Sequence, residues 1–201
     1  MSRLPWLLGL LGFFAAVVGI VYLAATRSAP QPGAPLSTPG FGTFQPITSP
    51  RGTTAVGPRE GARAPAFTAP RFDGGTLSLT DLRDKGVVMN FFASWCAPCR
   101  AEARELEAMY QKYRSQGIVF LGVDIETDTW EDAREFLKEF AITYLAIRDE
   151  KGEIARKYQM FGLPTTYFID KDGIVRSKFV GAFLGPEGVK ELERRIRLIL
   201  P

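Results

Sequence analysis

The six residues from Val87 to Phe92 constrain the fold more than any other part of this 201-residue chain. They read Val-Val-Met-Asn-Phe-Phe, an almost continuous apolar run that is typical of a β-strand covered on both faces. Because 46% of the residues are hydrophobic and 12% are aromatic, the chain can build a packed core, and global disorder is excluded. The run therefore predicts a central strand with packed elements on each side of its sheet.

Helical and strand patterns alternate after this run. Further strands are predicted at 118–123, 144–147, 166–169 and 174–180. Helices are predicted over 97–115, over 130–140 behind the capping candidates Asp128 and Thr129, and from about 186 to 199.

Turn signals predict two hairpins. Residues 73–75 read Asp-Gly-Gly and precede Leu77-Ser78-Leu79, which predicts a short hairpin before the core. Residues 170–173 read Asp-Lys-Asp-Gly and separate the last two predicted strands. The order of elements predicts an α/β fold with a mixed central sheet and helices on both faces.

Residues 1–27 are predicted to be a transmembrane anchor. Apart from the flanking Arg3 and Arg27 the segment has no charge, and residues 4–25 would span about 33 Å as a helix, enough for a hydrocarbon core. A cleaved signal peptide is the alternative, but its apolar stretch is usually shorter, and Leu23 is unfavourable at the −3 position of a cleavage site. The two flanking arginines leave the orientation open.

Residues 28–60 are predicted to be a linker, and residues 61–201 a single globular domain. Eight prolines and six glycines lie within the 38 positions 28–65, a composition typical of a flexible or semi-extended segment. About 140 residues remain for the domain, which is enough to bury roughly two-thirds of its unfolded surface.

The charge distribution argues against a nucleic-acid partner. Residues 1–59 contain four arginines and no acid, whereas residues 60–201 contain 21 basic and 22 acidic side chains. The globular part is therefore close to neutral and lacks the basic excess of a phosphate-binding surface. The chain also contains no histidine, which excludes a Ser-His or Cys-His triad and any His-ligated metal.

Both cysteines lie where the central strand runs into a helix. They occur in Trp95-Cys96-Ala97-Pro98-Cys99-Arg100, so a disulfide between them would close a small ring. Cys96 would face the free N–H groups of the first helical turn, which favour a thiolate, so we expect it to be the nucleophile. Cys99 would be shielded one turn further in and would resolve a mixed disulfide. Pro98 suits the first turn, where its missing N–H costs little.

Three other interpretations of this cysteine pair carry less weight. A zinc site needs two more ligands, and the chain has no histidine and no further cysteine to supply them. A structural disulfide across three residues closes too small a loop to restrain the unfolded chain much. A pair of buried, inert thiols does not explain their position at the end of a strand. The pattern favours a redox-active disulfide, and no other cofactor and no metal is expected.

Residues 61–201 resemble the TlpA/ResA-type membrane-anchored thioredoxins. The resemblance rests on Val-Met-Asn-Phe-Phe-Ala-Ser-Trp-Cys-Ala-Pro-Cys-Arg-Ala-Glu at 88–102 and Gly-Leu-Pro-Thr-Thr-Tyr-Phe-Ile-Asp at 162–170. It implies a thioredoxin fold with an added N-terminal hairpin and an activity in thiol–disulfide exchange. It also implies a single-pass protein of the cell membrane whose soluble domain lies on the extracytoplasmic side.

The same resemblance implies roles for three further residues. Pro164 would follow a cis peptide bond and face the dithiol, leaving the Leu163 backbone free to pair with an extended substrate. Glu102, three residues after Cys99, would modulate thiol ionisation and proton movement. The alternatives are an ordinary trans turn at Pro164 and, for Glu102, an acid stabilised by the helix dipole. Together with Trp95 and Pro98, Leu163 and Pro164 form the expected substrate-binding surface.

Three positions depart from related patterns. Asn90 stands where thioredoxin carries a buried aspartate, so a proton acceptor would have to be Glu102 or water. Arg104 replaces a proline that kinks the helix in many relatives. Thr165 follows Pro164 where the CcmG-type branch usually has glutamate.

The expected function is reduction of disulfides in translocated proteins. The resemblance to the TlpA/ResA-type proteins implies apocytochrome c as a substrate and a membrane electron carrier of the CcdA kind as the donor. The direction of exchange is left open, because the sequence does not encode a redox potential. A non-enzymatic binding module or chaperone is one alternative. A thiol peroxidase is another, although peroxiredoxins need a threonine where this chain has Ala93.

Overall fold

A computed structural model describes residues 54–201 of the protein. The predicted anchor at 1–27 and residues 28–53 of the predicted linker at 28–60 lie outside the described residues. Within 54–201, none of the helices combines the length and the apolar character needed to cross a bilayer.

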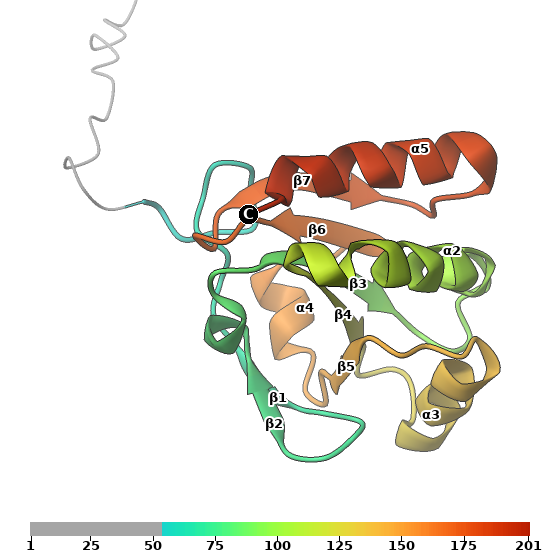
Figure 1. Cartoon of the computed structure of the whole chain (residues 1–201). Coiled ribbons are helices and arrows are strands. Elements are labelled where there is room, and N and C mark those ends of the chain that lie inside the picture. Colours follow the sequence, from blue (N-terminus) through green and yellow to red (C-terminus); the bar gives the residue numbers. More distant parts are fainter. Residues whose placement is uncertain (1–53) are drawn as a thin grey trace, which may run out of the picture. The chain divides into compact units, whose positions relative to one another are not determined.

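The core is a five-stranded mixed sheet in the order β5-β4-β3-β6-β7 (Figure 1). In chain order its strands are β3 (Gly86–Phe92), β4 (Ile118–Asp124), β5 (Leu145–Arg148), β6 (Thr165–Ile169) and β7 (Val175–Val180). β3 pairs in parallel with β4 and antiparallel with β6, so it is the central strand. All seven residues of β3 are buried, which confirms the prediction made from its apolar run.

Helices cover both faces of this sheet, as predicted. They are α2 (Ala97–Tyr113), α3 (Trp130–Glu139), α4 (Glu153–Lys157) and α5 (Gly185–Ile196). Phe92 stacks on Phe136 of α3, whereas its neighbour Phe91 contacts Tyr158 at the end of α4. Because successive strand residues point to opposite faces, α3 and α4 lie on opposite sides.

α2 and α5 lie side by side (Figure 1). The Tyr113 hydroxyl at the end of α2 donates a hydrogen bond of 2.8 Å to Glu193 of α5. Beneath them, Leu106 of α2 and Leu192 of α5 belong to one buried apolar cluster with Phe168 of β6. These contacts fix α2, and with it the cysteine motif at its start, against the sheet.

Before the core, β1 (Thr68–Pro70) and β2 (Thr76–Ser78) pair antiparallel around the predicted turn. Leu79, expected at the end of this hairpin, instead begins a single 3-10 turn, Leu79–Leu82. The helix α4 was not predicted, because its five residues are too few to show a helical period. The Asp149 carboxylate supports it by accepting hydrogen bonds from the N–H groups of Ile154 and Ala155.

Candidate active site

The cysteine motif lies at the strand-to-helix junction that the sequence predicts. β3 ends at Phe92, and Cys96 is the residue that caps the start of α2. Its Sγ accepts a hydrogen bond from the Cys99 N–H at 3.3 Å, and Pro98 lies in the first turn. The first sulfur therefore receives one of the N–H groups that a helix leaves free at its start, which stabilises negative charge on that sulfur.

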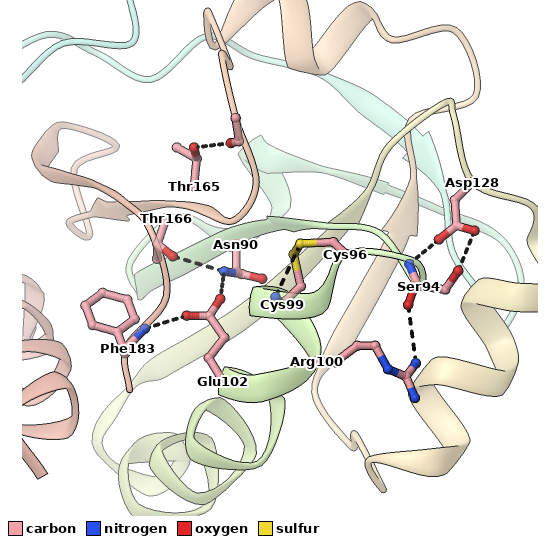
Figure 2. The surroundings of a disulfide bond; sticks show 11 residues. Asn90, Ser94, Cys96, Cys99, Arg100, Glu102, Asp128, Thr165, Thr166 and Phe183 are labelled. Atoms are coloured by element: carbon pink, nitrogen blue, oxygen red, sulfur yellow. Dashed lines mark hydrogen bonds between the residues drawn. A yellow bond between two sulfur atoms is a disulfide. The ribbon is translucent and has the colours of Figure 1, made fainter. Parts of the chain in front are cut away.

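Cys96 and Cys99 form a disulfide, with 5.3 Å between their Cα atoms. Both side chains are largely buried, but only Cys96 borders a surface hollow. Cys99 lies one helical turn further in, as expected for a resolving cysteine (Figure 2).

The hollow beside Cys96 has a volume of about 550 Å³ and a mostly apolar lining. It is formed by the motif itself, by the loop after β4 and by the segment before β6; its lining residues are Trp95, Cys96, Ala97, Pro98, Ile125, Glu126, Thr127, Met160, Phe161, Gly162 and Leu163. Two large rings at its border are open to solvent, Trp95 at 60% and Phe161 at 91% exposure. Large apolar surface of this kind, left exposed around a reactive group, is typical of a docking surface.

The segment before β6 brings Leu163 to this hollow, whereas Pro164, expected on the same surface, is buried and does not line it. The Leu163–Pro164 peptide bond is cis, as the resemblance implies. Thr165 is buried, and its hydroxyl donates a hydrogen bond of 2.7 Å to the Gly162 carbonyl, which holds the turn (Figure 2). Among the described residues, no hydrogen-bond partner reaches the Leu163 N–H or C=O. These two groups are available to an extended polypeptide.

The inner side of the disulfide is a buried polar network around Glu102 (Figure 2). The Asn90 amide donates to Glu102 Oε1 at 2.9 Å and to Thr166 Oγ1 at 3.0 Å. The Phe183 N–H donates to Glu102 Oε2 at 2.9 Å. Both carboxyl oxygens are therefore hydrogen-bonded, and the side chain is 0% exposed.

Burial raises the pKa of Glu102 to about 7, although the hydrogen bonds from Phe183 and Asn90 act in the opposite direction. Burial dominates because a carboxylate loses the stabilisation of bulk water when it is enclosed. A carboxyl group with this pKa can take up or release a proton near neutral pH, one helical turn from Cys99.

The structure thus brings Trp95, Cys96, Pro98 and Leu163 together around one hollow. Glu102 lies away from it, on the buried side of the same helix. Of the aromatic residues near the motif, Phe92 belongs to the core, whereas Phe161 is at the surface. Helix α2 continues through Arg104 to Tyr113 without interruption, consistent with the missing proline.

Two residues near the site were missed in the sequence. Of the two capping candidates, Thr129 caps α3 as predicted, whereas the Asp128 carboxylate binds Ser94 next to the motif. Arg148, at the end of β5, is buried behind the loop that lines the hollow. The only signal of this role in the sequence was the position of Arg148 directly after the apolar strand predicted at 144–147. No group of three or more acidic or cysteine side chains within 54–201 could hold a metal ion.

The model of the AhpC/TSA family matches residues 61–178, more than half of the chain. The chain belongs to the AhpC/TSA family. Within this AhpC/TSA protein, 142 residues are 32% identical to the thiol-disulfide oxidoreductase ResA of Bacillus thuringiensis subsp. konkukian, covering 70% of this chain and 79% of ResA. ResA of Oceanobacillus iheyensis is 34% identical over 129 residues, 62% of this chain and 66% of that protein.

Among solved structures, a thioredoxin-family thiol:disulfide interchange protein from Chlorobium tepidum aligns with a TM-score of 0.62 and 27% identity. The alignment covers 71% of this AhpC/TSA protein and 98% of the Chlorobium chain. The thioredoxin fold and the resemblance to ResA-type proteins are therefore confirmed, and the protein is a thiol:disulfide oxidoreductase with a Cys96–Cys99 pair.

Proposed function

We propose that this protein acts as a reductant of disulfide bonds in polypeptides that have crossed a membrane. The observation that supports this most strongly is the position of the disulfide. Its first sulfur borders an apolar hollow that is also lined by Leu163, whose backbone N–H and C=O have no hydrogen-bond partner within residues 54–201. An unfolded polypeptide supplies both the apolar side chains and the extended backbone that such a surface binds.

The exchange proceeds in two steps, starting from the reduced protein. The Cys96 thiolate attacks one sulfur of the substrate disulfide, so that a mixed disulfide forms and the other substrate sulfur leaves as a thiolate. Cys99 then loses its proton and attacks the Cys96 sulfur, which releases the second substrate thiolate and forms the Cys96–Cys99 disulfide. Two electrons pass from the protein to the substrate.

Glu102 receives the proton of Cys99 in this scheme. Its pKa of about 7 suits a group that must accept a proton at neutral pH. Asn90 carries a neutral amide, which donates to Glu102 and cannot be the acceptor itself.

The remaining parts of the proposal concern location and partners. Residues 1–27 would anchor the protein in the cell membrane, with the domain on the extracytoplasmic side. A membrane electron carrier of the CcdA kind would return two electrons to the Cys96–Cys99 disulfide. Apocytochrome c is the proposed substrate, because the resemblance to the TlpA/ResA-type proteins suggests it.

The direction of exchange is tested by equilibrating the full-length chain, kept in mild detergent, with mixtures of reduced and oxidised glutathione. A reductant should have a midpoint potential more negative than that of the glutathione couple. A more positive potential would overturn the proposed direction and assign the protein as an oxidant.

The substrate is tested with apocytochrome c whose two cysteines have been joined in a disulfide. The reduced protein should open this disulfide in a stoichiometric reaction, and the same polypeptide with alkylated cysteines is the control. If the protein reduces insulin but not the apocytochrome c disulfide, the proposed substrate is contradicted, but the proposed reductase activity is not. Rapid consumption of hydrogen peroxide instead would favour a peroxidase, although the buried Ala93 offers no hydroxyl for one.

A further inference from the structure

The peptide before the motif is held from two sides (Figure 2). The Asp128 carboxylate accepts hydrogen bonds from the Ser94 N–H and, at 2.7 Å, from the Ser94 hydroxyl. Arg100 donates to the Ser94 carbonyl at 3.2 Å. Every polar group of Ser94 is therefore bonded, two residues before Cys96.

Asp128 is suited to this role as a carboxylate. Burial alone would raise its pKa, but the hydrogen bonds from Ser94 and from the Thr129 N–H outweigh burial and hold the pKa below its usual value. An ionised carboxylate accepts stronger hydrogen bonds than a neutral amide does.

Arg148 holds the loop that carries Asp128. Its guanidinium is paired with Asp124 and donates to the Ile125 carbonyl at 2.9 Å and to the Asp128 carbonyl. A longer contact of 3.4 Å reaches the Glu126 carbonyl. The arginine thus binds the backbone of the segment 125–128 from inside the protein.

This arrangement is not explained by stability alone. Arg148 is only 6% exposed, and within the described residues its Nε and the Asp124 Oδ1 have no hydrogen-bond partner. A buried ion pair with unsatisfied atoms adds little net stability, because desolvation offsets the attraction. Burial also raises the pKa of Asp124, which Arg148 opposes, but the bonds to the loop come from the guanidinium and form with either state of that carboxyl.

The loop is one wall of the hollow beside Cys96. Ile125, Glu126 and Thr127 line it, facing the segment that ends in Leu163. One set of hydrogen bonds therefore joins Arg148 to the backbone of this wall and to Asp128. A second set joins Asp128 to Ser94, in the segment between β3 and Cys96 that we call the Cys96 arm.

We propose that Asp128 and Arg148 are positioning residues for disulfide exchange. Asp128 sets the position of the Cys96 arm, and Arg148 sets the wall against which a polypeptide docks. The inference rests on the proposed reaction with protein disulfides. Asp128 is predicted to affect exchange with every disulfide, whereas Arg148 is predicted to affect chiefly exchange with polypeptides that dock in the hollow.

Two substrates separate the two roles. The small disulfide 5,5′-dithiobis(2-nitrobenzoate) needs only a correctly placed Cys96, whereas insulin must also dock in the hollow. Asp128→Asn should slow the reaction of the reduced full-length chain with both disulfides by about tenfold, since small displacements of a reacting group are costly. Loss of Arg148 frees the wall of the hollow directly and reaches Cys96 only through the Asp128 loop. It should therefore slow the reaction with insulin by about tenfold and the reaction with the small disulfide by less.

The arginine is best tested as Asp124→Asn combined with Arg148→Met, since removing Arg148 alone leaves a buried carboxyl without its partner. Asp149→Asn is the matched control for Asp128→Asn. Asp149 is also a buried acid that accepts two backbone N–H bonds, but it supports α4 and makes no contact with Ser94. The Asp149→Asn variant should lower the thermal midpoint, but the folded variant should react with insulin and with the small disulfide at the wild-type rates.

Equal effects of Asp128→Asn and Asp149→Asn on the small disulfide would overturn the role of Asp128. An unchanged insulin rate in the double variant would overturn the role of Arg148. If the wild-type protein reacts with the small disulfide but not with insulin, the proposed function fails, while the small disulfide still decides the role of Asp128.

Discussion

The two sides of the disulfide have opposite surroundings. Cys96 borders an apolar hollow with two exposed aromatic side chains, Trp95 and Phe161, in its lining, whereas Cys99 lies toward the enclosed polar network of Glu102 (Figure 2). The two sulfurs are chemically identical, so any difference in their roles must come from these surroundings. The comparison teaches that the start of one helix can serve two steps on different faces. A polypeptide docks on the face of Cys96, and a proton is transferred on the face of Glu102.

The enclosed side is expected to show the largest effect, on stability. The folded, oxidised protein holds the Glu102 proton with a pKa of about 7, above the ordinary value of 4.5. The resulting stabilisation is complete below about pH 4.5 and is lost as the pH rises through 7. Relative to Glu102→Gln, the free energy of unfolding should fall by about 3 kcal/mol over this interval.

Denaturant titrations of both proteins across that pH range measure this difference. Parallel pH profiles of the wild type and Glu102→Gln would show that the inner side is not a proton site, and would remove half of the comparison.

The second prediction concerns turnover. If Glu102 accepts the proton of Cys99, Glu102→Gln should lower the rate of insulin reduction at pH 8 by about a hundredfold, as expected for loss of a general base. The wild-type rate should contain a rise near pH 7 that the variant lacks. Steady-state rates at saturating reductant check this, and an unchanged profile in the variant would assign the proton to water.

Substitutions on the open side, in the hollow beside Cys96, are expected to have a smaller effect, which is confined to the binding of the polypeptide substrate. Replacing Trp95 or Phe161 by Ser removes apolar surface from the border of the hollow and should raise KM for insulin by about tenfold, with kcat little changed. Leu198→Ser is the matched control, because Leu198 is also an exposed apolar side chain but does not line the hollow. A similar rise in KM for Leu198→Ser would show that general surface apolarity, rather than the hollow, binds the substrate.

Much of this arrangement could be predicted from local patterns. The buried strand β3, the position of the cysteines at the start of α2 and the mixed sheet follow from apolar runs and helical periods that a short window contains. The residues that hold the site in place could not be found in this way. Ser94 and Asp128 are 34 positions apart, and Arg148 binds loop carbonyls that lie 20 to 23 positions earlier.

The environment of Glu102 shows the same limit. Its spacing from Cys99 was visible in the sequence, but its raised pKa depends on burial beneath Asn90 and the Phe183 backbone, which only the fold brings together. In the same way, the apolar run predicts that Phe92 is buried, but nothing in the sequence shows that Phe161 lies at the surface.

The central claim, that the surroundings give the two sulfurs different roles, is tested most directly by trapping the mixed disulfide. Reduced Cys99→Ser and Cys96→Ser chains are mixed with insulin, the products are separated without reductant, and the linked peptides are identified by mass spectrometry. The account predicts a stable adduct through Cys96 in the Cys99→Ser chain and almost none in the Cys96→Ser chain. Equal adduct formation by both chains would contradict it.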